Sequence, residues 1–244
     1  MTVIATAGRG CPVTDPAQRQ LTLPLSGVPD PDFASFFARG NEQLLHRLQR
    51  LAAGAECGQF YLWGSVSAGK SHLLQALCLQ AQDNGLGCLY LAGRELLKLH
   101  PDVLSDMSSC ELLCLDDVDR LLGTAGWEEA LFHLYNRQRD SGHSLVLTAQ
   151  LPPRQLPPLL ADLQSRFMAM ELYQVHSLTD DDKCELLRRA AHARGFALAD
   201  EVATFILQRS SRDMVSLQQV LQRLDQRSLA EQRLITLPFV KKVM

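Results

Sequence analysis

Hydrophobic residues between positions 33 and 177 follow two alternating patterns. Leucines spaced for one helical face predict a helix around Leu44, Leu45, Leu48 and Leu51. Apolar runs of strand length follow, separated by helix-length segments, at Phe60–Trp63, Cys88–Ala92, Leu112–Leu115 and Leu145–Leu147. Strands of this kind are typical of a parallel sheet that crossover helices bury on both faces. The pattern therefore predicts an α/β wound sheet.

The pattern changes after Ser177, where strand signals end and only helical periods remain. Thr179 is a predicted N-cap, and three aspartates follow it in the first turn, where the helix dipole favours negative charge. Helices are predicted from Asp180 to Arg194, from Asp200 to Arg209 and from Met214 to Ala230, with a short one near Phe239. We thus expect an α/β domain at residues 32–176 and a small all-helical lid domain at residues 177–244.

Residues 1–31 show no sustained period and are rich in Gly, Pro and Thr, which predicts a flexible tail. Within the tail, residues 20–25 alternate apolar and polar side chains with no partner strand in view. Such a segment can lie extended in a groove of another protein. The predicted contact residues are Gln20, Leu21, Leu23 and Leu25.

Composition excludes several classes of protein. Hydrophobic residues make up 46% and charged residues 21% of the 244, as in ordinary globular chains. The net charge of −3, without a basic stripe, argues against strong independent DNA binding. No apolar run reaches the roughly 18 residues of a membrane span, and no secretory signal is present, so a cytoplasmic location is expected. Seven cysteines without a CxxC pair predict neither a disulfide framework nor a zinc site.

A phosphate-binding motif follows the strand at Phe60–Trp63. Residues 64–71 read GSVSAGKS, which fits GxxxxGK[ST], and a predicted helix comes next. Glycines let backbone N–H groups surround the phosphates of ADP or ATP, Lys70 adds a positive charge, and the Ser71 hydroxyl can ligate Mg²⁺. The predicted nucleotide-binding residues of the loop are Gly64, Ser65, Val66, Ser67, Ala68, Gly69, Lys70 and Ser71.

The strand at Leu112–Leu115 ends in two acids. Asp116 is predicted to position Mg²⁺, and Asp117 to orient or polarise the attacking water. Asp119 is an alternative to either of them. Thr148 ends the next strand and is a candidate sensor of the γ-phosphate, although β propensity also explains a threonine there.

The motifs, their order and the helical C-terminal region resemble the AAA+ ATPases, in the branch of the bacterial replication initiator DnaA. Residues 33–37 with Gly40 and Asn41 look like the initiator's adenine-side segment, which implies that Phe33 and Asn41 bind the nucleotide. Residues 128–136 look like its central helix. The initiator ends in a helix-turn-helix DNA-binding domain, for which no room is expected after the lid. The chain is more similar still to the Hda-type regulators of this branch.

Similarity to these regulators implies a function. The tail segment 20–25 looks like their peptide for the DNA sliding clamp, and Leu163–Phe167 is similar to Box VII, which makes Arg166 the candidate arginine finger. The implied protein is nucleotide-bound, reaches DNA mainly through the clamp, and stimulates hydrolysis of DnaA-bound ATP, so that re-initiation is suppressed. Without the resemblance, Arg166 is a surface arginine near a helix C-terminus, and the segment is ordinary tail.

One position departs from the family pattern. Val215 stands where the lid's sensor II arginine is expected, and the nearest arginine is Arg212. Either Arg212, about one turn earlier, reaches the nucleotide, or the protein binds a nucleotide without closing on a γ-phosphate, which suits a regulator that works with ADP. Two other functions stay open: a self-sufficient ATPase such as a helicase loader, and an adaptor that only recruits partners. Assembly into a homo-oligomer is also left open.

Overall fold

The computed structural model describes residues 4–5, 31–36, 38–105, 107, 110–157, 160–210, 214–231 and 234–244. The chain divides into two compact units, Met1–Ser177 and Leu178–Met244. The predicted partner-binding residues Gln20, Leu21, Leu23 and Leu25 lie outside the described residues, as does Arg212.

The first unit is built on one sheet whose strands lie in the order β1-β3-β4-β5-β2-β6. Its members are β1 (Ile4–Ala5), β2 (Gln59–Trp63), β3 (Cys88–Ala92), β4 (Leu112–Asp116), β5 (Ser144–Ala149) and β6 (Glu171–Gln174). Strands β2 to β6 pair in parallel, which confirms the predicted wound sheet. Strand β1 pairs antiparallel with β3 and was not predicted, because two residues are too few to show a period.

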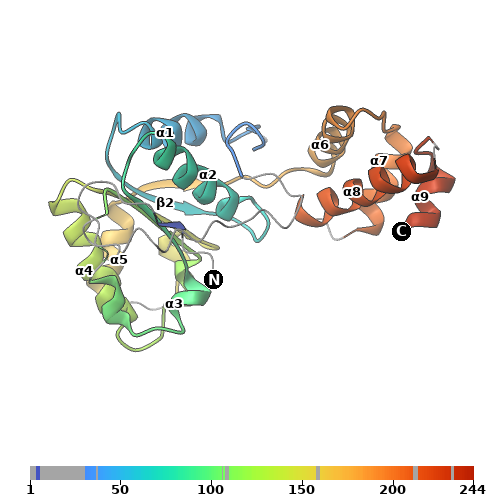
Figure 1. Cartoon of the computed structure of the whole chain (residues 1–244). Coiled ribbons are helices and arrows are strands. Elements are labelled where there is room, and N and C mark those ends of the chain that lie inside the picture. Colours follow the sequence, from blue (N-terminus) through green and yellow to red (C-terminus); the bar gives the residue numbers. More distant parts are fainter. Residues whose placement is uncertain are drawn as a thin grey trace. The chain divides into compact units, whose positions relative to one another are not determined.

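Helices cover both faces of this sheet (Figure 1). Helices α1 and α2 lie on one face, and α3, α4 and α5 lie on the other. Their bounds are α1 Glu42–Ala52, α2 Lys70–Asp83, α3 Gly93–Leu96, α4 Trp127–Asp140 and α5 Ala161–Ala169, with short 3₁₀ turns η2 Pro101–Leu104, η3 Val118–Arg120 and η4 Pro153–Gln155.

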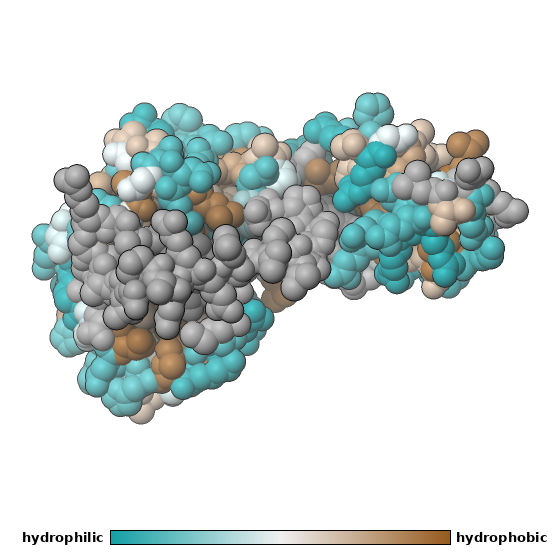
Figure 2. Space-filling model, viewed as in Figure 1, coloured by the Kyte–Doolittle hydropathy of each residue, from teal (hydrophilic) through white to brown (hydrophobic). Residues whose placement is uncertain are grey.

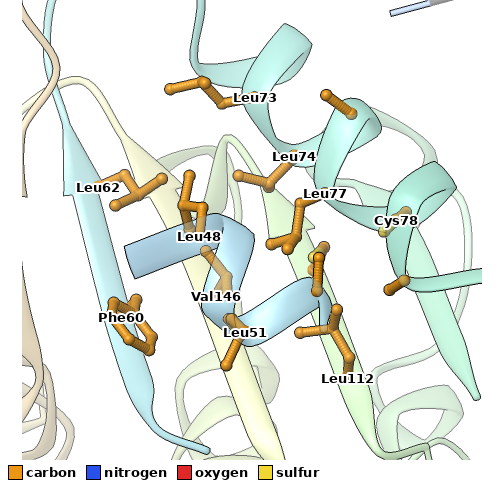
Figure 3. Packing of buried hydrophobic residues seen from close by; sticks show 14 of the residues in the cluster. Leu48, Leu51, Phe60, Leu62, Leu73, Leu74, Leu77, Cys78, Leu112 and Val146 are labelled. Carbon is orange, nitrogen blue, oxygen red and sulfur yellow. The ribbon is translucent and has the colours of Figure 1, made fainter. Parts of the chain in front are cut away.

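Successive residues of a strand enter different cores, because strand side chains alternate between faces. Phe60 and Leu62 of β2 pack toward α1 and α2, against Leu48 and Leu74 (Figure 3). Tyr61, between them in sequence, belongs to the core under α4 and α5. Burying one such side chain contributes about 1.5–3 kcal/mol to stability. This packing on both faces fixes the register of the strands and so the positions of their carboxyl ends.

The second unit consists of α6 (Asp180–Ala193), α7 (Asp200–Arg209), α8 (Met214–Glu231) and α9 (Leu237–Val243). Thr179 caps α6 as predicted: its hydroxyl accepts a hydrogen bond from the Asp182 N–H at 3.2 Å, and the Asp182 carboxylate accepts from the Thr179 N–H at 3.0 Å. The four helices share a core of their own that includes Leu187, Leu217 and Phe239.

The coloured surface in Figure 2 is mainly hydrophilic, with small hydrophobic areas between. Among the residues that the structure describes, no helix combines the length and the apolar character that crossing a membrane requires.

Candidate nucleotide-binding site

The loop between β2 and α2 includes positions at which most side chains are not allowed. A Cβ atom added to Gly64 would lie 2.5 Å from the carbonyl oxygen of Val175, so this position has no room for a side chain. Ser67 and Gly69 both have positive φ, at 71° and 92°. Such left-handed residues within a turn point neighbouring N–H groups inward and form a nest for an anion.

Helix α2 begins immediately after this loop, and within the described part of the chain no side chain caps its N-terminus. Its N-cap residue, Gly69, offers no side chain to cap the helix, and the first-turn N–H groups of a helix have no partner within it. The Ser71 side chain is exposed in the same turn. Free amides and the positive end of the helix dipole together form an anion site.

Lys70 is folded back over the loop. Its ammonium group donates hydrogen bonds to the carbonyl oxygens of Gly64 at 2.8 Å and Ser65 at 2.9 Å, and the residue is only 6% exposed. Burial lowers the pKa of Lys70, and the charges of the three nearby acids oppose this, in the order Asp117, Asp116, Asp119. The structure therefore brings the lysine and the acidic strand end together.

Asp116 ends β4 with both carboxylate oxygens engaged. The Thr148 hydroxyl donates to Oδ1 at 2.6 Å, and the Tyr90 hydroxyl donates to Oδ2 at 2.8 Å. Thr148 also accepts from the Asp117 N–H at 2.8 Å and is fully buried. Its hydroxyl, predicted to sense a phosphate, thus braces the acidic strand end in this arrangement.

Asp117 and Asp119 have different surroundings. Asp117 has a positive φ of 53°, and its carboxylate lies 3.2 Å from the Arg120 guanidinium. Asp119 accepts a hydrogen bond from the Gln150 N–H at 3.3 Å, and burial raises the pKa of its carboxyl group. Asp117 is thus ion-paired at the surface, whereas Asp119 is partly buried and bound to the backbone directly after β5.

A magnesium ion fits the donor set at this edge of the sheet. Mg²⁺ prefers hard oxygen ligands and is usually bound by one or two carboxylates together with phosphates and waters. The Asp116 carboxylate and the Ser71 hydroxyl are such ligands, and the acids around Lys70 supply negative charge.

Phe33 and Asn41, which are predicted to lie on the adenine side, are both buried. Phe33 packs into the core shared with α1 and α2, at 8% exposure. The Asn41 amide donates to the His176 carbonyl at 3.1 Å, and its oxygen accepts from the His176 N–H at 2.9 Å. Asn41 therefore joins the start of α1 to the chain that leaves β6.

Replacing Asn41 with alanine is expected to destabilise the protein by about 1–3 kcal/mol, because both backbone groups of His176 lose their partner. Urea denaturation of the variant and the wild type measures the difference. A change below about 0.5 kcal/mol, the usual range of surface substitutions, would show that Asn41 does not brace this region.

A groove of about 480 Å³ lies beside Asn41, between the first turn of α1 and strand β6. None of the loop residues 64–71 lines it, so it is distinct from the phosphate loop. Its lining residues are Gly40, Asn41, Gln43, Leu44, Glu171, Leu172, Tyr173, Gln174 and His176.

Phe36 belongs to the predicted adenine-side segment, and its ring lies close to His72, a residue that the sequence analysis missed. A Cβ atom on Gly69 would lie 2.7 Å from the Phe36 ring, and that ring lies 6.0 Å from the imidazole of His72. The His72 ring nitrogen is 3.0 Å from the Asp32 carbonyl oxygen, so the segment before α1 is fastened to α2. The position of His72 directly after the motif was the available signal.

Arg166 lies on α5 against aromatic rings of α4. Its guanidinium carbon is 5.6 Å from the Phe132 ring centroid and 6.0 Å from that of Tyr135. Its Nε is buried and has no hydrogen-bond partner in the described part of the chain. Glu128 of α4 accepts a hydrogen bond from the Leu160 N–H at 2.9 Å, which ties α4 to the start of α5. For the lid, the structure places Val215 on α8 but does not describe its side chain.

Comparison with known families shows to which family of nucleotide-binding proteins the chain belongs. The family model of the bacterial DnaA ATPase domain matches residues 32–172, more than half of the chain. The chain belongs to the bacterial DnaA ATPase domain family. A second family model, described as the lid domain of Hda, matches residues 180–244. The predicted AAA+ fold of the DnaA branch, with a helical lid region, is confirmed, and the chain is a DnaA-related protein of replication initiation.

Solved structures show the same fold at low sequence identity. Domain III of DnaA from Thermotoga maritima is 22% identical, with a TM-score of 0.73 over 89% of this chain and 96% of that one. AMPPCP-bound DnaA from Aquifex aeolicus is 21% identical, with a TM-score of 0.68 over 84% of this chain and 68% of that one. The RuvB branch migration motor of Thermotoga maritima is 20% identical, with a TM-score of 0.64 over 88% and 71%.

Proposed function

We propose that this protein is a nucleotide-bound regulator that stimulates hydrolysis of ATP on a DnaA-type initiator. In this proposal residues 64–71 hold ADP or ATP with Mg²⁺, and the segment at Gln20, Leu21, Leu23 and Leu25 binds the DNA sliding clamp. Arg166 is the arginine finger that the protein supplies to the partner's nucleotide. The family match and the Hda lid match support the replication setting.

The state of Arg166 is the observation that carries the proposal. No carboxylate among the described residues pairs with it, whereas Arg47, Arg120 and Arg188 all form ion pairs. Aromatic faces attract a guanidinium without neutralising its charge. Phe132 and Tyr135 therefore hold the side chain in place and leave its charge available for an anion outside the chain.

The helix that carries Arg166 is firmly anchored, as a positioned catalytic group requires. Phe167, the next residue, is fully buried, and its ring lies 5.5 Å from that of Tyr61 in the sheet. Glu128 fixes the other end of α5 through Leu160. A rigidly held arginine contributes more to a transition state than a mobile one, because less ordering remains to be done during the reaction.

The protein's own site favours nucleotide binding over rapid turnover. Asp117, the residue predicted to polarise water, is ion-paired with Arg120, and Thr148 is occupied by the acidic strand end. The alternative of a self-sufficient ATPase is supported by the closeness of Asp116 and Asp117 to Lys70. Multiple turnover of ATP by the isolated protein would favour that alternative.

The direct test follows hydrolysis in the partner. An initiator loaded with radiolabelled ATP, and freed of unbound nucleotide, is mixed with this protein in its ADP form and with clamp loaded on DNA. We expect faster conversion to ADP only when all components are present. An unchanged rate with active clamp and well-folded proteins would contradict the proposal.

The clamp contact is tested by a double substitution in the tail. The double variant Gln20→Ala, Leu21→Ala is expected to bind the clamp at least tenfold more weakly, because a loss of about 1.4 kcal/mol in binding free energy has that effect. Surface plasmon resonance on immobilised clamp measures the change, with ADP binding as the control for folding. If the double variant binds the clamp as tightly as the wild type, the segment at residues 20–25 is not the clamp-binding site.

A further inference from the structure

The hydroxyl of Tyr90 makes a contact at the nucleotide site that the motifs do not contain. It donates a hydrogen bond to Asp116 Oδ2 at 2.8 Å, opposite the oxygen bound by Thr148. Three neighbouring strands thus meet at one carboxylate, because Tyr90 comes from β3, Asp116 from β4 and Thr148 from β5. All three residues are at most 5% exposed.

Strand register explains the contact. Tyr90 is paired with Cys114, two residues before Asp116, and shares a core with it on the face covered by α1 and α2. A tyrosine side chain spans about two residues of a strand, roughly 6.6 Å at 3.3 Å per residue. Its hydroxyl therefore reaches the carboxyl end of the adjacent strand while its ring stays in the core.

Tyr90 also connects this carboxylate to the phosphate-binding helix. Its ring lies in the core beneath α2, together with Leu73 and Leu77 of that helix. Tyr90 therefore lies between α2 and the predicted metal ligand Asp116, to which its hydroxyl donates.

We propose that Tyr90 is a positioning residue for the divalent cation that accompanies the nucleotide. Its hydroxyl, together with Thr148, fixes both oxygens of Asp116, so the carboxylate is already oriented when a magnesium nucleotide enters. The inference rests on the proposed nucleotide site and adds a residue to its metal half. Without the phenol, Asp116 keeps the hydrogen bond from Thr148, and its second oxygen is no longer fixed.

A purely structural tyrosine is the competing explanation, and the chain offers a matched control. Tyr61 on β2 is also buried, and its hydroxyl donates to the Leu151 carbonyl oxygen at 2.9 Å. Tyr61→Phe removes one buried hydroxyl of the same kind, with no contact to Asp116. The two variants should lose comparable stability, so only a metal-specific effect separates them.

The experiment is titration calorimetry of ADP into the full chain, with Mg²⁺ and with EDTA. Mg²⁺ should raise the ADP affinity of Tyr90→Phe about tenfold less than it raises that of the wild type, because one hydrogen bond to a charged group is lost. In EDTA the ADP affinity of the variant should stay within about twofold of the wild type. Tyr61→Phe is expected to match the wild type in both buffers. Thermal unfolding confirms that both variants fold.

An unchanged magnesium gain in Tyr90→Phe would overturn the inference, as would an equal loss in Tyr61→Phe. Failure of the underlying nucleotide proposal is distinguishable, because the wild type itself would then bind no ADP in either buffer. Binding of Mn²⁺ with ADP, followed by electron paramagnetic resonance, is a second readout. Tyr90→Phe should weaken the bound Mn²⁺ signal, and an unaltered signal would contradict the inference.

Discussion

Arg166→Ala is expected to abolish most of the stimulation of initiator ATP hydrolysis, a loss of roughly 10³-fold or more where the arginine acts fully in trans. The reason is that a guanidinium neutralises charge that develops on the transferring phosphoryl group. The variant keeps its own loop at residues 64–71, so ADP binding should be unchanged. Single-turnover hydrolysis on the initiator, with clamp present, measures the loss.

Arg50→Ala is the matched control for this experiment. Arg50 lies on α1, is half exposed and pairs with Glu56, so removing it changes the net charge equally without touching α5. We expect full stimulation from this variant. If Arg166→Ala stimulates hydrolysis as well as the wild type does, the protein is instead an adaptor that recruits partners and takes no part in catalysis.

Lys70→Ala is expected to have the second large effect, on nucleotide affinity. Hydrogen bonds to charged groups are worth about 1.5–3 kcal/mol, which corresponds to roughly a 10- to 100-fold weaker binding of ADP. In the structure the ammonium group rests on two loop carbonyls, so it lies where phosphate oxygens would replace them. ADP at 100 times the wild-type dissociation constant stabilises the wild type by about 2.7 kcal/mol, and the variant should lose about 1.3–2.3 kcal/mol of this.

Lys98→Ala serves as the control for Lys70, because Lys98 is exposed and forms a surface ion pair with Glu95. Its ADP affinity should match that of the wild type. If Lys70→Ala binds ADP as tightly as this control, the phosphates are not held by the loop at residues 64–71.

The central strands were predictable because burial on both faces leaves a continuous apolar run. Strand β3 has the predicted bounds, Cys88–Ala92, and β4 extends the predicted run by one residue, Asp116. The capped start of α6 was predictable for a different reason, since Thr179 and Asp182 interact locally. Helix caps and hydrophobic periodicity depend on residues that are close in sequence, so both can be recognised without knowing the tertiary structure.

Contacts between distant segments were not predictable from the pattern. The sequence marks Asp116 and Thr148 as strand ends but does not say that their side chains bond to each other. In the sequence, Tyr90 is simply one residue of an apolar run. Only the register of the strands shows that its hydroxyl lies beside Asp116. The same holds for the rings beneath Arg166, which come from a helix about thirty residues earlier.

Calorimetric titration of ADP into nucleotide-stripped wild-type protein tests the central claim most directly. We predict one saturable site per chain, whose affinity for ADP is raised by Mg²⁺ and lowered by Lys70→Ala. Well-folded protein that takes up neither ADP nor ATP would contradict it.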